Sequence, residues 1–436
     1  MKISIFGCGY VGLTTAIGLA EMGNQVLGID TNEEKVKLLQ KGVAPFHEPG
    51  LQDLLKKNRK AKRLQFSSDA QLGIQKSDLI ICAVATPSNG KNETDLKAVL
   101  QVAEAFALYA KEEKIFINKS TVPVGTSEKI RQKIQQKQTK KVPFFVASNP
   151  EFLREGSAVK DFFQPDRIVV GIGKQDEKAR KILKKLYSPF QKSGIPLLFT
   201  SLRNAELIKY ASNSFLATKI SFANELANYC DLVGGDVKDV ARGIGLDPRI
   251  GAEFLNAGIG FGGSCLPKDL KVLIELGKKS DFSFHLLQAV QRINNAQTDR
   301  LIDLLRKEYK TLSGRNIALW GLSFKPETDD LRDAPSLNIV KKLLKLKAHI
   351  TVFDPVSMPS FQKICGAKVT YAPDAYSALK NADALLLLTE WNEFRSPDFR
   401  KMRNLMRRPL ILDGRNVYDP KELSAQSFSY YGIGRS

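Results

Sequence analysis

The sequence predicts an α/β protein with two Rossmann-like, doubly wound lobes joined by a long central helix and a helical middle section. Three observations lead to this prediction. Short apolar runs alternate with amphipathic helical patterns in the first 200 residues, the same alternation returns after residue 313, and a glycine-rich turn follows the first apolar run. We therefore expect three domains, over residues 1–200, 201–312 and 313–436.

The apolar runs set the expected strands. Alternation of this kind predicts parallel sheets with helices on both faces, such as a helix over Asp95–Glu113. In the first domain, strands are expected at Lys2–Phe6, Gln25–Asp30, Asp78–Val84, Lys114–Asn118, Pro143–Ala147 and Arg167–Gly171. In the last domain, they are expected at Asn316–Gly321, Ile350–Asp354, Ala384–Thr389 and Leu410–Asp413.

The middle of the chain is helical. Ser201–Val233 contains neither glycine nor proline, carries few charges and stops at Gly234-Gly235. Thirty residues of helix span about 45 Å at 1.5 Å per residue. Because it is apolar on most sides, we expect it to be buried between domains or between subunits. A second helix is expected from about Phe284 to Tyr309.

Composition narrows the class of protein. The 436 residues carry a net charge of +20, which favours anionic small molecules such as nucleotides as ligands. The basic run Lys56–Arg63 lacks aromatic residues and is interpreted as a solvated helix end, with a nucleic-acid or surface contact as the weaker alternative. Glycines interrupt the apolar stretch Ile3–Ala20, whereas a signal peptide needs a continuous apolar core. No other segment is long enough to span a bilayer. We expect a cytoplasmic protein that binds neither nucleic acid nor membrane.

Cysteines and histidines give little support for a metal site. The five cysteines form no CxxC pair, and the three histidines lie far apart in the sequence. We therefore expect no metal, and reduced cysteines that are structural at Cys8, Cys82, Cys230 and Cys365.

Gly7-Cys8-Gly9-Tyr10-Val11-Gly12 is a GxGxxG turn between a predicted strand and a predicted helix. In such turns Gly7 would allow the tight bend, Gly9 would let a pyrophosphate approach, and Gly12 would pack against the strand. Asp30 ends the next strand, where a carboxylate binds ribose hydroxyls and repels a 2′-phosphate. NAD is therefore the expected cofactor. Lys35 is either a contact to the cofactor phosphates or a solvated helix lysine.

Cys265 lies in the glycine-rich segment Gly258–Asp269. Pro267 suits the first turn of a helix, so the thiol would lie at a helix N-terminus beside Lys268, and both features favour the thiolate. Asp269 would follow one turn later on the same face and could hold a water. A nicotinamide site with a nucleophilic thiol indicates aldehyde oxidation through a thiohemiacetal and a thioester.

Seven motifs in order carry a resemblance that covers essentially the whole chain. They are Gly7–Gly12, Ser120–Pro123, Asn149–Gly156, Lys209 with Asn213, Gly262–Asp269, Phe324–Arg332 and Asp413–Asn416. In these motifs the sequence resembles the UDP-glucose/GDP-mannose dehydrogenase family. The resemblance implies an enzyme that uses two NAD+ in turn to oxidise the C6 alcohol of a nucleotide sugar to a carboxylate. It also assigns the first domain to NAD, the middle one to dimerisation and the thiol, and the last to the UDP-sugar.

The family's catalytic residues are matched one by one. By this resemblance Cys265 is the nucleophile, and Lys209 and Asn213 hold the reacting oxygen. Asp269 and Glu151 match acids that activate water, and Thr121 matches the residue that positions it.

The resemblance also implies binding residues and a homodimer or higher oligomer, with Arg249 in a motif that reaches the neighbouring subunit. The NAD contacts are Gly7, Gly9, Tyr10, Val11, Gly12, Asp30, Lys35, Thr86, Thr121, Glu155, Lys268 and Arg332. The nucleotide-sugar contacts are Glu151, Phe152, Leu153, Arg154, Glu155, Lys209, Asn213, Arg249, Phe254, Leu255, Gly262, Lys325 and Arg415.

The substrate branch is expected to be UDP-glucose. Asp413–Asn416 and Gly245–Ile250 are similar to that branch, whereas Leu266 after the thiol is more typical of GDP-mannose members. The alternatives are GDP-mannose or a UDP-N-acetylhexosamine with the same mechanism. A two-electron dehydrogenase with a structural Cys265, or a basic binding protein regulated by NAD, agrees less well with the thiol and with Lys209 and Asn213.

Overall fold

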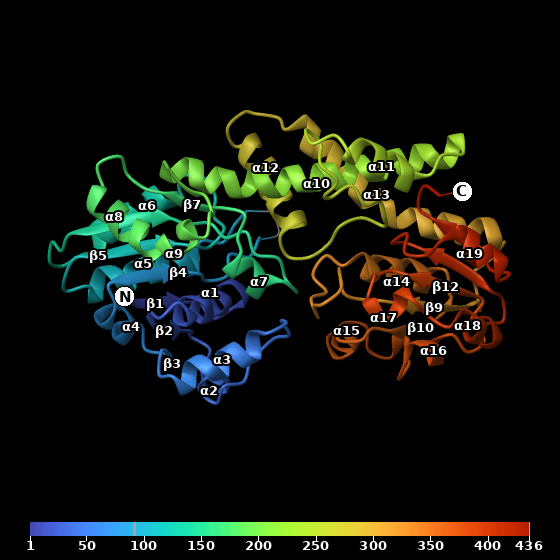
Figure 1. Cartoon of the computed structure of the whole chain (residues 1–436), viewed down its shortest axis with the longest axis horizontal. Coiled ribbons are helices and arrows are strands. Elements are labelled where there is room, and N and C mark those ends of the chain that lie inside the picture. The colour runs from blue at the N-terminus through green and yellow to red at the C-terminus, as the bar shows by residue number, and fades with distance from the viewer. Residues whose placement is uncertain (90–92, 436) are drawn as a thin grey trace. The chain divides into compact units, whose positions relative to one another are not determined.

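The computed structural model describes residues 1–89 and 93–435, which form two compact units, Met1–Ser212 and Asn213–Ser436. Figure 1 colours the first unit blue to green and the second green to red. The long helix α10 (Leu202–Val233) begins in the first unit and continues into the second. The first unit contains a mostly parallel sheet and the second a parallel sheet, so the predicted fold class is confirmed.

The first unit is built on an eight-stranded sheet in the order β3-β2-β1-β4-β5-β6-β7-β8. Neighbouring strands pair in parallel except β6 and β7, which pair antiparallel. The strands are β1 (Lys2–Phe6), β2 (Gln25–Ile29), β3 (Leu64–Ser67), β4 (Leu79–Cys82), β5 (Lys114–Asn118), β6 (Phe144–Ser148), β7 (Ile168–Gly171) and β8 (Leu197–Thr200).

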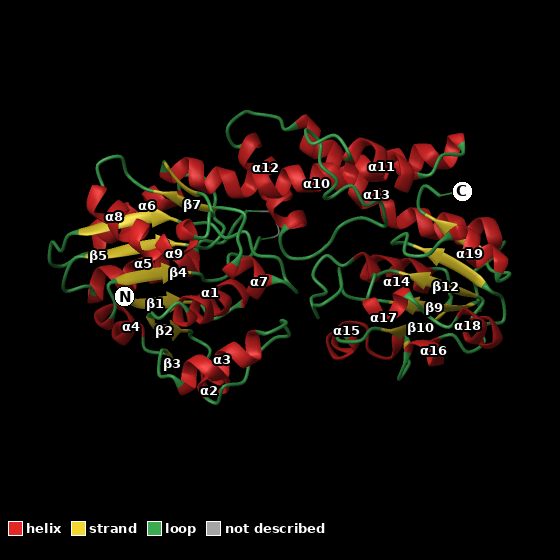
Figure 2. Ribbon diagram, in the orientation of Figure 1, coloured by secondary structure: helices red, strands yellow, loops and turns green. Residues whose placement is uncertain are grey.

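Helices cover both faces of this sheet (Figure 2). Because side chains alternate along a strand, Ile115 and Ile117 of β5 join one core while Phe116 joins the other. The helices are α1 (Tyr10–Glu21), α2 (Glu33–Gln40), α3 (Leu51–Lys60), α4 (Ala70–Lys76), α5 (Lys97–Tyr109), α6 (Thr126–Lys137), α7 (Ala158–Phe163), α8 (Glu177–Leu186) and α9 (Ser188–Lys192).

The second unit contains a six-stranded parallel sheet in the order β11-β10-β9-β12-β13-β14. In both units the chain winds outward from a central strand, first to one side and then to the other, which places a topological switch at β1/β4 and at β9/β12. The strands are β9 (Asn316–Trp320), β10 (His349–Phe353), β11 (Thr370–Tyr371), β12 (Ala384–Leu387), β13 (Leu410–Asp413) and β14 (Ser429–Gly432).

Helices of the second unit form a helical part and a sheet-covering part. The helical part comprises the end of α10, α11 (Val237–Gly245), α12 (Leu266–Lys278) and α13 (His285–Glu308). The remaining helices are α14 (Pro335–Lys345), α15 (Met358–Cys365), η1 (Gly366–Lys368), α16 (Ala375–Ala378), α17 (Asn392–Arg395), α18 (Phe399–Leu405) and α19 (Pro420–Ala425).

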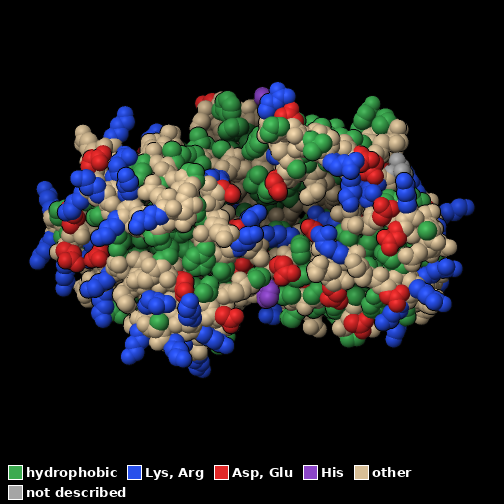
Figure 3. Space-filling view, viewed as in Figure 1, with side chains coloured by type: hydrophobic (Ala, Val, Ile, Leu, Met, Phe, Trp, Pro, Cys, Tyr) green, Lys and Arg blue, Asp and Glu red, His purple; other side chains and the backbone are tan. Residues whose placement is uncertain are grey.

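The predicted strands and the two long helices are present within a few residues of their expected bounds, whereas β3, β8, β11 and β14 were not predicted. The basic run ends α3, and Lys57 pairs with Glu21 at 2.5 Å. Lysines and arginines are spread over the visible face of each unit (Figure 3). Among the described residues, none of the helices combines the length and apolarity that crossing a bilayer requires.

The expectation that the long helix is buried on most sides is not met within a single chain. Phe215, Phe222 and Tyr229 of α10 keep 65%, 50% and 61% of their surface exposed. These three aromatic residues are spaced by seven positions, so they lie along one stripe of the helix. The stripe is therefore exposed, and burial of the helix between subunits stays a prediction.

Candidate active site

The glycine turn at β1 has the three properties expected of it. Gly7 adopts φ +92°, and a Cβ there would lie 2.7 Å from the Ala83 carbonyl oxygen. A Cβ at Gly12 would lie 1.7 Å from the Gly7 oxygen, so this position must stay bare for the helix to pack. A Cβ at Gly9 would meet nothing within 4 Å. The open space at Gly9 lies where α1 begins, with Tyr10 and Val11 in its first turn, and it fits a pyrophosphate.

Asp30 follows β2 and faces this turn. Its carboxylate accepts hydrogen bonds from the Cys8 amide at 2.8 Å and the Asn32 amide at 3.0 Å, and it pairs with Lys35 at 2.9 Å. Burial alone would raise the pKa of Asp30, but the bonds from Asn32, Lys35 and Cys8 lower it below its usual value. Asp30 is therefore an anion at the edge where a ribose would lie. Lys35 is held on Asp30, and its contact to cofactor phosphates stays a prediction.

The loops after β4 and β5 are tied together beside the turn. Thr86 Oγ1 donates to the Thr121 carbonyl oxygen at 2.8 Å, and Ser120 Oγ donates to the Val84 oxygen at 2.8 Å. These bonds fix Thr121 at the carboxyl edge of the sheet, where ligands of α/β proteins bind.

Glu206 of α10 supports the segment that follows Thr121, a contact that sequence reasoning missed. Its carboxylate accepts from the Gly125 amide at 2.6 Å and from the amide and hydroxyl of Ser127, both at 2.7 Å. Burial raises the pKa of this carboxyl above its usual value despite these bonds. Glu206 thereby caps α6 and joins the segment after Thr121 to α10. Its partners lie 79 and 81 residues away in sequence, so no local pattern indicates the contact.

A buried ion pair joins α10 to the loop after β6. Lys209 Nζ lies 2.8 Å from Glu151 Oε1, and the side chains are 4% and 6% exposed. Glu151 Oε2 accepts from the Leu153 amide at 2.6 Å. Burial would raise the pKa of Glu151, but the attraction of Lys209 and the hydrogen bonds hold it below its usual value. The two side chains are therefore held as a charged pair, with Lys209 5.5 Å from the centre of the Phe152 ring.

The rest of the Glu151–Gly156 loop is held from the first domain's own helices. Arg154 is turned onto Asp161 of α7, with its Nη2 2.6 Å from the carboxylate. Glu48 accepts from the Gly156 and Ala158 amides, each at 2.7 Å, and also from the Tyr10 hydroxyl. Tyr10 therefore connects the glycine turn to the loop that carries Glu151 and Glu155. This contact through Glu48 was not predicted from the sequence.

In the second unit, Cys265 is the N-cap of α12 and Pro267 lies in its first turn. The Asp269 amide donates to the Cys265 carbonyl at 2.9 Å, and the Asp269 side chain is 1% exposed. Asn213 Nδ2 donates to Asp269 Oδ2 at 2.6 Å, and Lys268 pairs with Oδ1 at 2.8 Å. The predicted helix start is confirmed, and α12 and α10 bring Asp269 and Asn213 together.

The thiol differs from the other cysteines in its exposure. Cys265 is partly exposed, with Ser264 Oγ 3.5 Å from its sulfur. Cys8, Cys82, Cys230 and Cys365 are buried. A reagent in solution therefore reaches Cys265 more readily than the other four.

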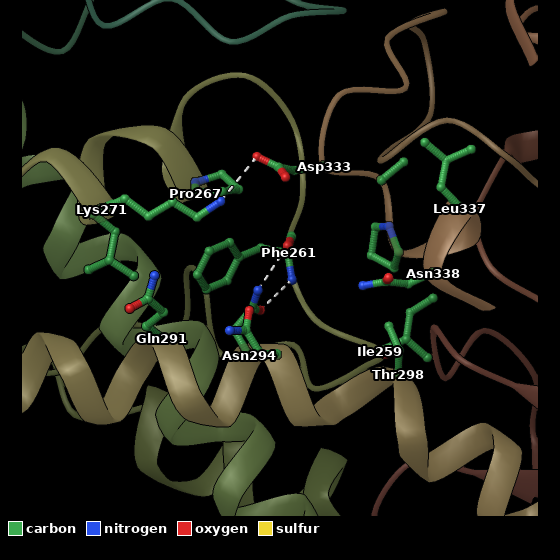
Figure 4. A pocket seen from close by; sticks show the side chains of 14 residues that line it. Ile259, Phe261, Pro267, Lys271, Gln291, Asn294, Thr298, Asp333, Leu337 and Asn338 are labelled. Carbon is green, nitrogen blue, oxygen red and sulfur yellow. Dashed lines mark hydrogen bonds and ion pairs between the residues drawn. The ribbon is translucent and has the colours of Figure 1, made fainter. Parts of the chain in front are cut away.

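The glycine loop before Cys265 is held by carboxamides. The Asn294 carboxamide accepts from the Phe261 amide at 2.8 Å and donates to its carbonyl at 3.1 Å, as Figure 4 shows beside a cavity of about 260 Å³. Gln297 donates to the Gly258 oxygen at 2.9 Å, and Asn224 accepts from the Gly258 amide at 2.8 Å. The loop is therefore held by α10 and α13 at Gly258 and by α13 at Phe261.

Arg415 holds the same loop from the sheet side. Its guanidinium donates to the carbonyls of Leu388 at 2.8 Å, Gly260 at 3.2 Å and Phe324 at 3.2 Å. Lys325 Nζ lies 5.6 Å from the centre of the Phe324 ring. The two cations predicted to bind a diphosphate thus belong to one cluster of loops at the carboxyl ends of β9, β12 and β13.

The remaining predicted contacts lie in loops of the second unit. Phe254 adopts φ +66°, which is rare for a bulky residue, and its neighbour Leu255 is buried. A Cβ at Gly262 would lie 2.4 Å from the Asp333 oxygen. Arg249 pairs with Asp247 and Arg332 with Asp330, and both arginines remain largely exposed. Among the described residues, no three His, Cys, Asp or Glu side chains are grouped so that they could hold a metal.

The open glycine turn and the ionised acid after β2 fit an NAD-dependent dehydrogenase, and the second α/β unit carries an accessible thiol. Comparison with known protein families identifies the family to which this dehydrogenase belongs. The chain belongs to the UDP-glucose/GDP-mannose dehydrogenase family, whose NAD binding domain matches residues 1–191, whose central domain matches 203–296 and whose UDP binding domain matches 318–420. The predicted family and the NAD cofactor are thereby confirmed.

Individual relatives are similar over the whole chain. The UDP-glucose 6-dehydrogenase TuaD of Bacillus subtilis is 44% identical over 434 residues, covering 100% of this chain and 93% of its own. The UDP-glucose 6-dehydrogenase of Pseudomonas aeruginosa is 43% identical, covering 100% and 98%. The solved UDP-glucose dehydrogenase of Pyrobaculum islandicum superimposes with a TM-score of 0.93 at 36% identity, covering 100% and 98%.

The two bonds between Asn294 and Phe261 lead to a prediction about the thiol. Asn294→Ala removes both bonds, so the loop before Cys265 should move and misplace the sulfur, because small displacements of reacting groups are costly. We expect kcat to fall roughly tenfold and the alkylation rate of Cys265 by iodoacetamide, followed by mass spectrometry, to change several-fold. The control is Asn295→Ala, an exposed neighbour on α13. Equal effects of the two substitutions would show that the Asn294 contact does not position the thiol.

Proposed function

We propose that this protein is a UDP-glucose 6-dehydrogenase, which oxidises UDP-glucose to UDP-glucuronate with two NAD+. The observation that carries the proposal is the accessible Cys265 at the N-cap of α12, beside the buried Asp269, in a chain with an NAD-binding domain. A simple alcohol dehydrogenase has no use for such a thiol, whereas a second oxidation from aldehyde to acid requires an adduct. The relatives of 43–44% identity over the full chain support UDP-glucose as the sugar nucleotide.

In the first oxidation, the C6 alcohol loses a proton to a basic group and a hydride to NAD+, which leaves an aldehyde. NAD+ supplies the hydride acceptor in both oxidations, one molecule for each. We assign Lys209 to the developing oxyanion, because a buried ammonium stabilises negative charge strongly where water is excluded. Glu151 orients that ammonium and keeps it charged.

In the second oxidation, the Cys265 thiolate adds to the aldehyde carbon and the carbonyl oxygen takes up a proton, giving a thiohemiacetal. Loss of that proton and of a second hydride gives a thioester. Water then attacks the thioester carbon, releasing the carboxylate and the thiol. We assign Asp269 and Glu151 to holding this water, with Thr121 positioning it and Asn213 orienting Asp269 at 2.6 Å.

Binding of the sugar nucleotide is assigned mainly to the last domain, residues 313–436, and NAD to the first domain, residues 1–200. Lys325 and Arg415 offer two cations to the diphosphate, and Phe254 and Leu255 are assigned as further contacts to the sugar nucleotide. In the loop after β6, Phe152, Leu153, Arg154 and Glu155 flank Glu151 and would contact the sugar. Arg332 and Lys268 would reach the cofactor.

We also propose a homodimer that forms through α10. Phe215, Phe222 and Tyr229 form an exposed aromatic stripe, and Leu232 and Val233 extend it with 80% and 58% exposure. Exposed apolar stripes of this kind mark protein interfaces. Arg249, exposed at 88% of its side chain, would then be offered to the neighbouring subunit. Among the described residues, Cys8, Cys82, Cys230 and Cys365 form no disulfide, which supports a cytoplasmic location because disulfides are rare in reducing compartments.

The stoichiometry of the reaction tests the proposed function. With UDP-glucose limiting and NAD+ in excess, we expect two NADH and one UDP-glucuronate for each UDP-glucose, measured by absorbance and by mass spectrometry of the nucleotide sugars. GDP-mannose, UDP-N-acetylglucosamine and UDP-N-acetylmannosamine serve as the comparison panel. A yield of one NADH with free aldehyde, or a clear preference for another nucleotide sugar, would contradict the proposal.

The aromatic stripe predicts the oligomeric state. Phe222→Glu places a charge in the middle of the stripe, and burying that charge in an interface is costly. We expect the dissociation constant of the dimer to rise by about a hundredfold in sedimentation analysis. Leu108→Glu is the matched control, because Leu108 is a comparably exposed apolar residue of α5. An unmodified protein that sediments as a monomer at micromolar concentration would rule out the interface.

A further inference from the structure

Lys119 is a half-buried cation that the proposed mechanism does not use. It directly follows β5, and Asn149 directly follows β6, the neighbouring parallel strand. Both residues therefore lie at the carboxyl edge of the first sheet, the edge that carries Thr121 and Glu151.

Three hydrogen bonds orient the group that holds Lys119. Lys119 Nζ donates to Asn149 Oδ1 at 3.0 Å, and the same oxygen accepts from the Tyr187 hydroxyl at 2.6 Å. Asn149 Nδ2 donates to the Val169 carbonyl at 2.8 Å, which fixes which way the carboxamide points. The Lys119 ammonium is therefore held by a carboxamide of fixed orientation and does not move freely in solvent.

The charges around Lys119 are those of the Glu151–Lys209 pair. Burial lowers the pKa of Lys119 to about 8, with Glu151 opposing the shift and Lys209 adding to it. Lys119 in turn contributes to the lowered pKa of Glu151. Tyr187 faces Lys119 through Asn149, and burial raises its pKa, so it stays neutral. The Glu151 carboxylate is thus paired with the Lys209 ammonium and is also attracted by the Lys119 ammonium.

We propose that Lys119 is a positioning residue of the Glu151–Lys209 pair, whose ammonium, held by Asn149, sets the net charge that the pair presents to the substrate. This inference rests on the proposed function. With Lys119 protonated, two cations and one anion give the cluster a charge of +1, which favours an oxyanion bound by Lys209. With Lys119 neutral, the cluster carries no net charge and that support is lost.

Lys119 then gains or loses its charge within the pH range in which the enzyme works. The stabilisation of the oxyanion should be greatest below about pH 8 and should decline as the pH rises through that value. Alcohol oxidation has its own pH dependence, so the comparison must be made between variants rather than along one profile.

The first test compares kcat of the unmodified protein, Lys119→Met and Lys119→Arg from pH 6.5 to 10. Methionine has a similar length and no charge. We expect the ratio of unmodified to Lys119→Met rates to be roughly tenfold near pH 7 and to decline with a midpoint near pH 8. Lys119→Arg keeps its charge at all these pH values, so its rate relative to the unmodified protein should rise above pH 8. A ratio that does not change with pH for either variant would overturn the inference.

The second test does not depend on activity. An unfolded lysine binds its proton up to its ordinary value of 10.5, whereas folded Lys119 releases it near 8. Between these values the unfolded state binds more protons, so the stability contributed by this residue increases with pH. We expect the difference in unfolding free energy between the unmodified protein and Lys119→Met to shift toward the unmodified protein from pH 8 to 10 and to be constant below pH 7. A constant difference throughout would contradict a titrating Lys119.

The outcomes separate this inference from the proposed function. Absence of UDP-glucose oxidation with a pH-dependent stability difference would overturn the function and retain a titrating Lys119 beside Glu151. UDP-glucose oxidation with flat ratios in both tests would retain the function and overturn the role of Lys119.

Discussion

The buried ion pair between Lys209 and Glu151 is the interaction on which the first half of the site depends. Taking two charges out of water is expensive, and removing one partner leaves the other uncompensated at a cost of about 3–5 kcal/mol. With both side chains at 6% exposure or less, the pair requires α10 and the loop after β6 to keep their separation. Glu206, one turn earlier on α10, adds a second constraint through the amides of Gly125 and Ser127.

The second unit also holds a buried carboxylate, with one neutral and one charged partner. Asp269 is almost wholly buried, and it is satisfied by Asn213 of α10 and by Lys268. The contacts of Asp269 also restrain the Cys265 thiol, because Cys265 and Asp269 lie one turn apart at the start of α12. Stability and reactivity are therefore coupled: the groups that satisfy buried charges also hold the groups proposed to react.

Much of this arrangement could be predicted from the sequence, because its signals are local. The glycine turn, Asp30 after β2 and Cys265 before Pro267 each lie within a short segment whose strand or helix is indicated by its own pattern. The short edge strands β3 and β14 escaped prediction because each mixes polar and partly exposed residues, whereas the equally short inner strands β4 and β12 are continuous buried apolar runs.

The contacts that escaped prediction join segments far apart in the chain. Glu206, Glu48 and Lys119 each act through partners between 30 and 110 residues away. Such residues look like ordinary surface charges in a sequence, and only the fold brings them to buried amides or carboxamides. Arg154 was predicted to contact the sugar, but its guanidinium is held on Asp161 in the structure. Its contact to the sugar stays a prediction.

The central claim is that Lys209 serves the hydride transfers while Cys265 is needed only for the second one. Single-turnover NADH formation from UDP-glucose, with enzyme in excess, tests it most directly in Cys265→Ser and Lys209→Ala, with Cys365→Ser as the control for a buried cysteine. The account predicts that Cys265→Ser forms no more than one NADH per UDP-glucose, at a rate near that of the unmodified protein. Lys209→Ala should slow the first hydride transfer by roughly a hundredfold. Formation of two NADH per UDP-glucose by Cys265→Ser at the unmodified rate would contradict the account.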